Sequence, residues 1–581
     1  MASECENRGM PTTYDVLAAR LAAAFDQLQP GADPVLRPSD RVDYQANGVM
    51  GLAKSLGRPP REVAEEVLAK LDLAGIAEVE IAGPGFLNIS VTTEFLGQQL
   101  NHLAGDSRAG IAPRTTARNI VIDYSAPNVA KEMHVGHLRS TVIGDSLARL
   151  YRFVGDNVIA RNHIGDWGTP FGMLIEHLID LGENAAVASL SMGDLDTFYR
   201  AARAKFDADD TFKERSRLRV VALQGGDAET RRLWQVLVSQ SVAYFQEVYE
   251  KLDVTMTPTD VVGESFYNDL LDDVVRDLDF AGLLVDSDGA KCVFPAGFEN
   301  RDGDPLPLIV QKSDEGFGYA ATDLAAVRDR VGTLGASEIL YVVGAPQAQH
   351  FAMVFATARA AGWLPESVKC EHIAFGNVLG SDRKMFKTRS GETVKLIGLI
   401  DEATERAASA LASRNPEMSE TERADLAVDL ARAALKYADL SNERQKDYVF
   451  DLDRMVALEG DTGPYLCYAH ARIQSIFRRL DGPYEPHAVN WTLAEPAARS
   501  LALGVLSFAE AIDATLSTLQ PHRLCTYLFD LAQRFTSFYE ACPVLSSEGD
   551  VRDERLALCA ATAKVLEVGL SLLGIRAPQR M

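Results

Sequence analysis

The sequence predicts an α/β protein joined to an all-α part: a parallel-sheet domain with helical insertions, a small α+β domain before it and a helical bundle after it. An apolar run at 119–124 is followed by helical periodicity at 135–154 and by a second apolar run at 158–162. Strand–helix alternation of this kind is typical of a parallel sheet covered by helices. From Ile397 onward the periodicity is almost wholly helical.

The N-terminal part combines helical and strand patterns. Apolar residues recur at helical spacing from Tyr14 to Leu28 and again at 61–71, and residues 83–90 alternate like a half-buried strand after a tight turn. Long charged helices at 194–207 and 229–252 interrupt the central strand–helix pattern, which marks the segment near 183–258 as an insertion. The predicted regions are a small α+β domain at 1–118, the sheet domain at 119–400, a helical region at 401–454 and a helical bundle at 455–581.

Composition narrows the class of protein. The 581 residues suffice for several domains, and no apolar run approaches the ~20 residues of a membrane span. Neither a signal peptide nor an Arg-rich transit segment is evident, and the seven cysteines are scattered without a Cys-x-x-Cys pair. We therefore expect a cytoplasmic protein without membrane association, disulfide framework or structural zinc.

The net charge of −24 argues against tight, indiscriminate binding to nucleic-acid backbones. It does not exclude a local basic track, because screening limits surface fields to about 8 Å at physiological salt. Any RNA contact should therefore be selective and shape-dependent.

Two histidines stand where a predicted strand passes into a predicted helix, in His134-Val135-Gly136-His137. Such a corner collects exposed backbone N–H groups and the positive end of a helix dipole, so it can hold a nucleotide phosphate. For this four-residue pattern alone, a pair of capping or core histidines is the simpler interpretation. The rest of the chain must decide between the two.

A second segment carries cations. Gly380 and Gly391 bracket a polar loop that contains Lys384 and Lys387. Lysines three residues apart can act as point charges on a polyphosphate, although a basic loop of this kind can also be a solvated surface turn.

Taken together, these segments resemble class I aminoacyl-tRNA synthetases. His134-Val135-Gly136-His137 resembles their HIGH signature, and Lys384-Met385-Phe386-Lys387-Thr388 resembles their KMSKS loop. Ser125-Ala126-Pro127-Asn128 and Leu138-Arg139-Ser140-Thr141, on either side of the histidines, are similar to arginyl-tRNA synthetases in particular. The segment 530–534 resembles the DALR anticodon-binding domain, and the ending 575–581 is similar to the usual terminus of that family.

The resemblance implies a Rossmann-type catalytic domain and assigns roles to single residues. It implies that His134, His137, Lys384, Lys387 and Lys131 are catalytic, and the relative importance of Lys131 and Lys387 stays open. It implies ATP binding by His134, Gly136, His137, Met385 and Lys387. The arginine-binding residues that it implies are Asn128, Glu264, Tyr319, Asp323, Gln347 and His350.

Carboxylates such as those of Glu264 and Asp323 suit an arginine substrate, because a carboxylate accepts two parallel hydrogen bonds from a guanidinium. Tyr319 and Asp323 are four residues apart and can share one face of a helix. Gly165-Asp166-Trp167-Gly168 also lies beside the active site in the resembling family, but its residues receive no individual role.

The resemblance implies an arginine–tRNA ligase that forms arginyl-adenylate from L-arginine and ATP with Mg²⁺, then transfers arginine to the 3′ end of tRNA(Arg). It further implies a tRNA-elbow contact for the N-terminal domain, an anticodon contact for the C-terminal domain and a monomer. Two alternatives remain: another class I synthetase or small adenylate-forming enzyme, and a non-catalytic paralogue that binds tRNA or a protein partner. Retention of both histidines and both lysines weighs against the paralogue.

Overall fold

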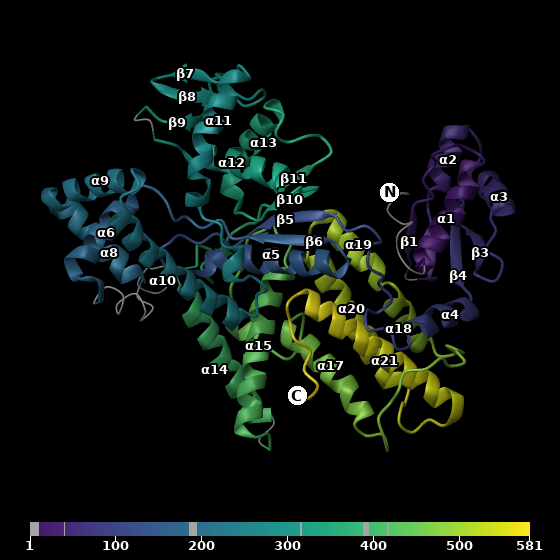
Figure 1. The fold of residues 1–581 in the computed structure, drawn as a ribbon. Helices are drawn as coiled ribbons and strands as arrows, with labels where there is room; N and C mark the ends of the chain where they lie inside the picture. The colour runs from purple at the N-terminus through teal and green to yellow at the C-terminus, as the bar shows by residue number, and fades with distance from the viewer. Residues whose placement is uncertain (1–10, 40, 185–194, 314–315, 387–393, 415–416) are drawn as a thin grey trace. The chain divides into compact units, whose positions relative to one another are not determined.

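The computed structural model describes residues 11–39, 41–184, 195–313, 316–386, 394–414 and 417–581 (Figure 1). The chain divides into two compact units, each built from segments distant in sequence. One unit comprises the residues up to Thr115 together with Leu458–Leu572 and Arg576–Met581, and the other comprises Thr116–Ala457 with Leu573–Ile575.

A four-stranded parallel sheet forms the centre of the second unit. Its strand order is β11-β10-β5-β6, so the strand that precedes the two histidines, β5, lies inside the sheet. Helix α5 (Val135–Phe153) connects β5 to β6. The predicted parallel sheet is confirmed. Its strands β5 (Asn119–Asp123) and β6 (Asn157–Arg161) correspond to the apolar runs at 119–124 and 158–162, and β10 (Glu338–Tyr341) and β11 (Lys369–His372) complete it.

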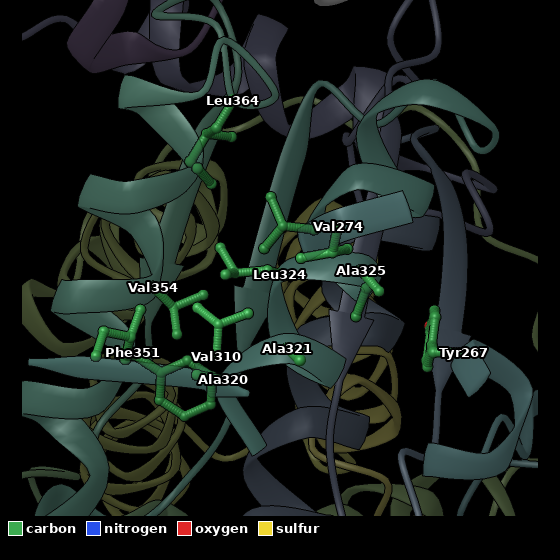
Figure 2. Packing of buried hydrophobic residues seen from close by; sticks show 14 of the residues in the cluster. Tyr267, Val274, Val310, Ala320, Ala321, Leu324, Ala325, Phe351, Val354 and Leu364 are labelled. Atoms are coloured by element: carbon green, nitrogen blue, oxygen red, sulfur yellow. The ribbon is translucent and has the colours of Figure 1, made fainter. Parts of the chain in front are cut away.

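A buried hydrophobic cluster fixes the helices on one face of this sheet. It joins α11 (Asn268–Phe280), α12 (Tyr319–Gly332) and α13 (Ala348–Ala360) to strand residues such as Ile339. Figure 2 shows Leu324 of α12 among Val274, Val310 and Val354. Burying a leucine stabilises a fold by about 1.5–3 kcal/mol. This packing holds the first turn of α12 beside the carboxyl ends of the strands.

Helices occupy the predicted insertion. They are α8 (Leu195–Ala208), α9 (Asp210–Gln224) and α10 (Ala228–Leu252), preceded by α6 (Pro170–Leu181). The sequence patterns predict α8 and α10 but not α9, which buries only Phe212, Ser216 and Leu223. A small antiparallel sheet, also without a prediction, precedes α12 and consists of β7 (Val285–Ser287), β8 (Ala290–Val293) and β9 (Leu308–Gln311).

The remainder of this unit consists mainly of two helices that pack on each other, α14 (Leu396–Arg414) and α15 (Glu420–Leu440). The parallel pair β12 (Val378–Leu379) and β13 (Tyr448–Val449) and the short helix α16 (Leu452–Met455) complete it.

The other unit combines an α+β part with a helical bundle. The α+β part has an antiparallel sheet in the order β1-β2-β4-β3. Gly97 lies directly on the ring of Trp491, where a Cβ would come within 2.9 Å, so the two parts of this unit pack closely. The elements of the α+β part are α1 (Thr13–Asp26), β1 (Leu36–Pro38), β2 (Tyr44–Ala46), α2 (Val49–Leu56), α3 (Pro60–Lys70), β3 (Ala77–Ala82), β4 (Phe86–Val91) and α4 (Thr93–Leu103). The bundle helices are α17 (Gly463–Phe477), α18 (Pro496–Leu506), α19 (Phe508–Thr518), α20 (His522–Ala541) and α21 (Gly549–Leu572).

No single described helix is long and apolar enough to cross a membrane. Only the bent pair α18 and α19 passes that test jointly, on length and composition alone.

Candidate active site

The two histidines cap the helix that follows them. His134 is the N-cap residue of α5, and its Nδ1 accepts the N–H of Gly136 at 3.1 Å. His137 Nδ1 accepts the N–H of His134, also at 3.1 Å, and the ring centroids are 4.0 Å apart. Because each Nδ1 accepts a hydrogen bond, the proton of each neutral ring is assigned to Nε2.

Both rings are neutral at physiological pH. Burial lowers the pKa of His137 to about 3 and also lowers the pKa of His134 from its ordinary value. A neutral imidazole with its proton on Nε2 is a hydrogen-bond donor, and it can therefore donate to a phosphate oxygen. Capping and phosphate binding use different nitrogens of the same ring, so the two interpretations of these histidines are compatible.

The loop before the corner holds an unusual backbone. Ser125, Ala126 and Ala130 have left-handed φ angles of 75°, 47° and 58°. Such conformations cost on the order of 1–3 kcal/mol each and persist where surrounding contacts impose them. Here each of the three backbone N–H groups donates to a side chain from another element: Ser140 Oγ (2.8 Å), Asn162 Oδ1 (3.0 Å) and Ser241 Oγ (3.0 Å). The corner is therefore held in place by α5, the end of β6 and α10.

A cavity of about 270 Å³ opens at this corner. Four of the predicted residues line it: Asn128, Lys131, His134 and His137. Four further residues that received no predicted role complete the lining: Glu132, Met133, Asp196 and Lys395.

Two lysines from different segments supply positive charge to this cavity. The ammonium group of Lys131 lies 4.6 Å from the ring centroid of Tyr199 on α8. Lys395 Nζ lies 2.9 Å from Oε1 of the buried Glu132, whose N–H donates to Asp196 Oδ1 at 3.1 Å. Lys395 stands four residues beyond Gly391, so its proximity to the lysine loop in sequence is the signal that could have found it.

The lysine loop begins with a tight turn after β12. Gly380 N–H donates to the carbonyl of Lys384 at 2.7 Å, and the side chains of Lys384 and Met385 are exposed. Lys387 lies outside the described residues. Beyond the loop, Val135 N–H donates to the Val394 carbonyl at 3.1 Å and Leu396 N–H donates to the Met133 carbonyl at 2.9 Å. The exit of the loop thus lies against the histidine corner, whereas Lys384 does not line the cavity.

A group of carboxylates lies at the start of α12. Asp323 is one turn into this helix, and its Oδ2 lies 2.6 Å from Nε2 of His350 on α13. Glu264 begins the short helix η3 (Glu264–Tyr267). Its pKa is raised to about 8, first by burial and then by the nearby carboxylates of Asp166 and Asp323. Carboxylates held this close to one another favour a cationic ligand.

The other predicted arginine-binding residues differ in location and exposure. Tyr319 is the first residue of α12 and is 75% exposed, and Gln347 is exposed in the short helix η4 (Ala345–Gln347). Asn128 lines the cavity and also covers Gly165, where a Cβ would come within 2.5 Å of its Oδ1. Because Asp166 follows Gly165, Asn128 lies between the histidine corner and the carboxylate group.

The described residues contain no group of three or more His, Cys, Asp or Glu side chains arranged to hold a metal ion.

A parallel sheet whose first strand ends in helix-capping histidines, with a lysine loop returning to that corner, defines a class I aminoacyl-tRNA synthetase. Comparison with known families agrees. The model described as tRNA synthetases class I (R), catalytic domain, matches residues 100–452. The DALR anticodon binding domain matches residues 466–581, and the arginyl tRNA synthetase N terminal domain matches residues 15–91.

Comparison with individual proteins identifies the family within this class. An arginine–tRNA ligase of Thermobifida fusca is 54% identical over 580 residues, covering 98% of this chain and 100% of the relative. One from Laribacter hongkongensis is 48% identical and covers 98% and 99%. The crystal structure of a Plasmodium falciparum arginyl-tRNA synthetase has a TM-score of 0.84 at 28% identity, covering 97% of this chain and 98% of that one. The Thermus thermophilus arginyl-tRNA synthetase has a TM-score of 0.81 at 26% identity, covering 97% and 99%.

The chain belongs to the arginyl-tRNA synthetase family. The predicted family and fold class are thereby confirmed, and the alternative of another class I synthetase is excluded. The roles of individual site residues stay predictions.

Proposed function

We propose that this chain is an ATP-dependent arginine–tRNA ligase. One observation carries the proposal: the helix-capping histidines and the carboxylate group lie in one unit, joined by Asn128, which lines the cavity and covers Gly165. The first feature suits a nucleotide phosphate, and the second suits a guanidinium.

Arginine binds with its guanidinium between Glu264 and Asp323. Tyr319, Gln347 and His350 complete the pocket around the guanidinium. Asn128 binds the α-amino or carboxylate end of arginine. Bidentate hydrogen bonds from a planar guanidinium to carboxylates give both affinity and orientation.

Activation requires no nucleophile from the protein. An oxygen of the arginine carboxylate attacks the α-phosphorus of ATP, and the bond from that phosphorus to the β-phosphate oxygen breaks, releasing pyrophosphate with Mg²⁺. Catalysis then consists of positioning and charge stabilisation. Nε2–H of His134 and His137 donates to phosphate oxygens, with Gly136 and Met385 contacting the nucleotide. Lys384, Lys387 and Lys131 neutralise the leaving pyrophosphate.

In the second step a ribose hydroxyl of the terminal adenosine of tRNA(Arg) attacks the acyl carbon, and AMP leaves. The N-terminal domain at 1–118 contacts the tRNA elbow, the helices at 401–454 contact the stem, and the bundle at 455–581 reads the anticodon. The proposal includes a monomer that acts in the cytoplasm without membrane association.

Exchange of labelled pyrophosphate into ATP tests this function. We expect exchange with L-arginine in the presence of tRNA(Arg) and none with the other amino acids. Exchange that requires a different amino acid, or none with arginine plus tRNA(Arg), contradicts the proposal. Binding of tRNA(Arg) without any exchange instead supports the non-catalytic paralogue.

The variant Asp323→Asn assigns the arginine end of the site. We expect the KM for arginine to rise at least about 100-fold, since a charge-assisted pair with the guanidinium is lost, while the KM for ATP changes less than about twofold. An equal rise of both KM values would remove Asp323 from the arginine pocket.

A further inference from the structure

The segment Gly165-Asp166-Trp167-Gly168 has no part in the mechanism above, yet its aspartate is buried in a specific set of contacts. Asp166 as a whole is 4% exposed. Its Oδ1 accepts the N–H of Ser265 at 2.9 Å, and its Oδ2 accepts the hydroxyl of Ser265 at 2.6 Å. Ser265 follows Glu264, so Asp166 holds the residue next to a predicted arginine ligand.

The backbone of the segment Gly263-Glu264-Ser265 passes close to this carboxylate. A Cβ on Gly263 would come within 2.3 Å of Asp166 Cγ, a distance that no side chain tolerates. Glu264 N–H donates to the carbonyl of Ile164 at 3.1 Å. Two hydrogen bonds from Ser265 to Asp166 and one from Glu264 to Ile164 therefore join the two segments, and they leave Glu264 little freedom of backbone conformation.

The Asp166 segment is itself held from α10. Trp234 Nε1 donates to the backbone carbonyl of Asp166 at 2.7 Å. The rings of Trp167 and Trp234 also meet edge to face, with centroids 5.8 Å apart and planes at 85°. The main chain of Asp166 is thus fixed independently of its side chain, which leaves the carboxylate free to position Ser265.

A buried carboxylate normally lies opposite a positive charge or several donors, because burial opposes its ionised form. Here the donors are the N–H and hydroxyl of Ser265 and the N–H of Asp166 itself, and His163 is a positively charged neighbour that lowers its pKa. The Glu264 carboxylate also lies close by. Placing a second acid so close to Glu264 disfavours the ionised Glu264 carboxylate in the empty pocket, since like charges repel. The arrangement becomes favourable when a cation occupies the space beside Glu264.

We propose that Asp166 is a positioning residue for arginine: it clamps Gly263-Glu264-Ser265 so that the Glu264 carboxylate faces Asp323, and it adds negative potential to the guanidinium end of the pocket. This inference rests on the proposed function, because it takes Glu264 as a ligand of arginine. Asp166 acts through Ser265 and Glu264 and makes no contact of its own with the substrate.

Ser265 provides the sharpest test, because it can be changed while both carboxylates remain. Ser265→Ala removes one donor to Asp166, and Ser265→Thr keeps it. We expect Ser265→Ala to raise the KM for arginine about fivefold, part of the 10-fold or more that a hydrogen bond to a charged group can supply, with the KM for ATP unchanged. Ser265→Thr should restore the arginine KM to within about twofold of the parent.

Asp166→Asn extends the test, with Asp260→Asn as its matched control. Asp260 caps a neighbouring turn, where its carboxylate accepts both the N–H and the hydroxyl of Thr257 at 2.8 Å, but it is not among the groups that act on Glu264. Measured at pH 8.5, where Glu264 is largely ionised, Asp166→Asn should raise the arginine KM at least about tenfold, as expected for a misplaced charged ligand. Asp260→Asn should leave the ratio of the two KM values unchanged.

The outcomes separate this inference from the proposed function. If the parent protein does not activate arginine, the proposed function fails. If the parent and Asp323→Asn behave as expected but Ser265→Ala changes only the melting temperature, Asp166 is a structural turn residue and the inference is wrong. Equal increases of the arginine and ATP KM values in Ser265→Ala also overturn it. Should Asp166→Asn not fold, the comparison of Ser265→Ala with Ser265→Thr still decides.

Discussion

Arginine binding should release a proton, and the proton should come from Glu264. In the empty pocket the pKa of Glu264 is about 8, raised by burial and by the carboxylates of Asp166 and Asp323. At pH 7 a group with that pKa is protonated in about 10 of 11 molecules. A bound guanidinium favours the ionised carboxylate, so the site must lose about 0.9 proton per arginine at pH 7.

The same argument sets the size and sign of the pH effect. Arginine binds the form of the protein in which Glu264 is ionised. The observed affinity is therefore the affinity of that form divided by the ratio of total to ionised Glu264. Because this ratio falls as the pH rises, the affinity rises with pH. Between pH 6.5 and 8.5 this ratio falls from about 33 to about 1.3, which predicts about a 25-fold decrease of the dissociation constant, or about 1.9 kcal/mol.

Calorimetry can measure this directly. Titrating arginine into the protein in buffers of different ionisation enthalpy gives the number of protons released. Glu264→Gln should bind arginine more weakly at pH 8.5 and without linked release from this site. His350 lies 2.6 Å from Asp323 in the same pocket, so the variant is needed for assignment. A pH-independent dissociation constant in the parent, or release that survives in Glu264→Gln, would refute the reasoning.

Three further outcomes follow from the geometry. Asp166→Asn should move the midpoint of the arginine pH profile to lower pH, because one of the two carboxylates that raise the Glu264 pKa is gone; an unchanged midpoint in calorimetric titrations would contradict this. His137→Ala should lower kcat for pyrophosphate exchange about 10²–10³-fold through loss of a phosphate donor, and should destabilise the protein by about 1 kcal/mol through loss of a helix cap, as measured by urea unfolding. A double-mutant cycle of Glu132→Gln and Lys395→Met should give a coupling of about 1–2 kcal/mol, reduced from a fully buried pair because Lys395 is half exposed; additive effects would show that the pair contributes nothing.

The sequence predicted those elements whose buried residues form a recognisable pattern within one short segment. Strands β5 and β6 are short apolar runs, and α5 carries leucines and valines at helical spacing, so each could be recognised without knowing its neighbours. Helix α9 was not predicted because its polar residues nearly surround it and only Phe212, Ser216 and Leu223 are buried. Strand β7 was missed for a similar reason, since its three residues are mostly exposed. These elements form through contacts with other elements: α9 packs against α6, and β7 pairs with β8.

The candidate site divides in the same way. His134 and His137 are local to one corner, and Tyr319 and Asp323 are local to one helical turn. Asp196 and Lys395 line the cavity although they lie about 60 and 260 residues beyond the histidines. No pattern within one segment predicts that they lie close to the histidines. Asp166 is the clearest case. It follows a strand as a turn residue would, and the residues that it contacts beside Glu264, Gly263 and Ser265, lie far along the chain.

The two alternatives for the histidines, helix cap or phosphate ligand, come together in the structure because an imidazole has two nitrogens. Using Nδ1 for the cap fixes the tautomer and leaves the proton on Nε2, where the ring can donate to a phosphate oxygen as proposed above. Burial keeps His137 neutral, with its pKa near 3, across the whole range in which an enzyme of this family would work. The charge needed by ATP must then come from lysines, and the group that titrates near neutrality, Glu264, lies at the arginine end. It follows that pH should control the affinity for the amino acid while leaving nucleotide binding nearly constant. That asymmetry distinguishes this arrangement from a site whose histidines act as cations.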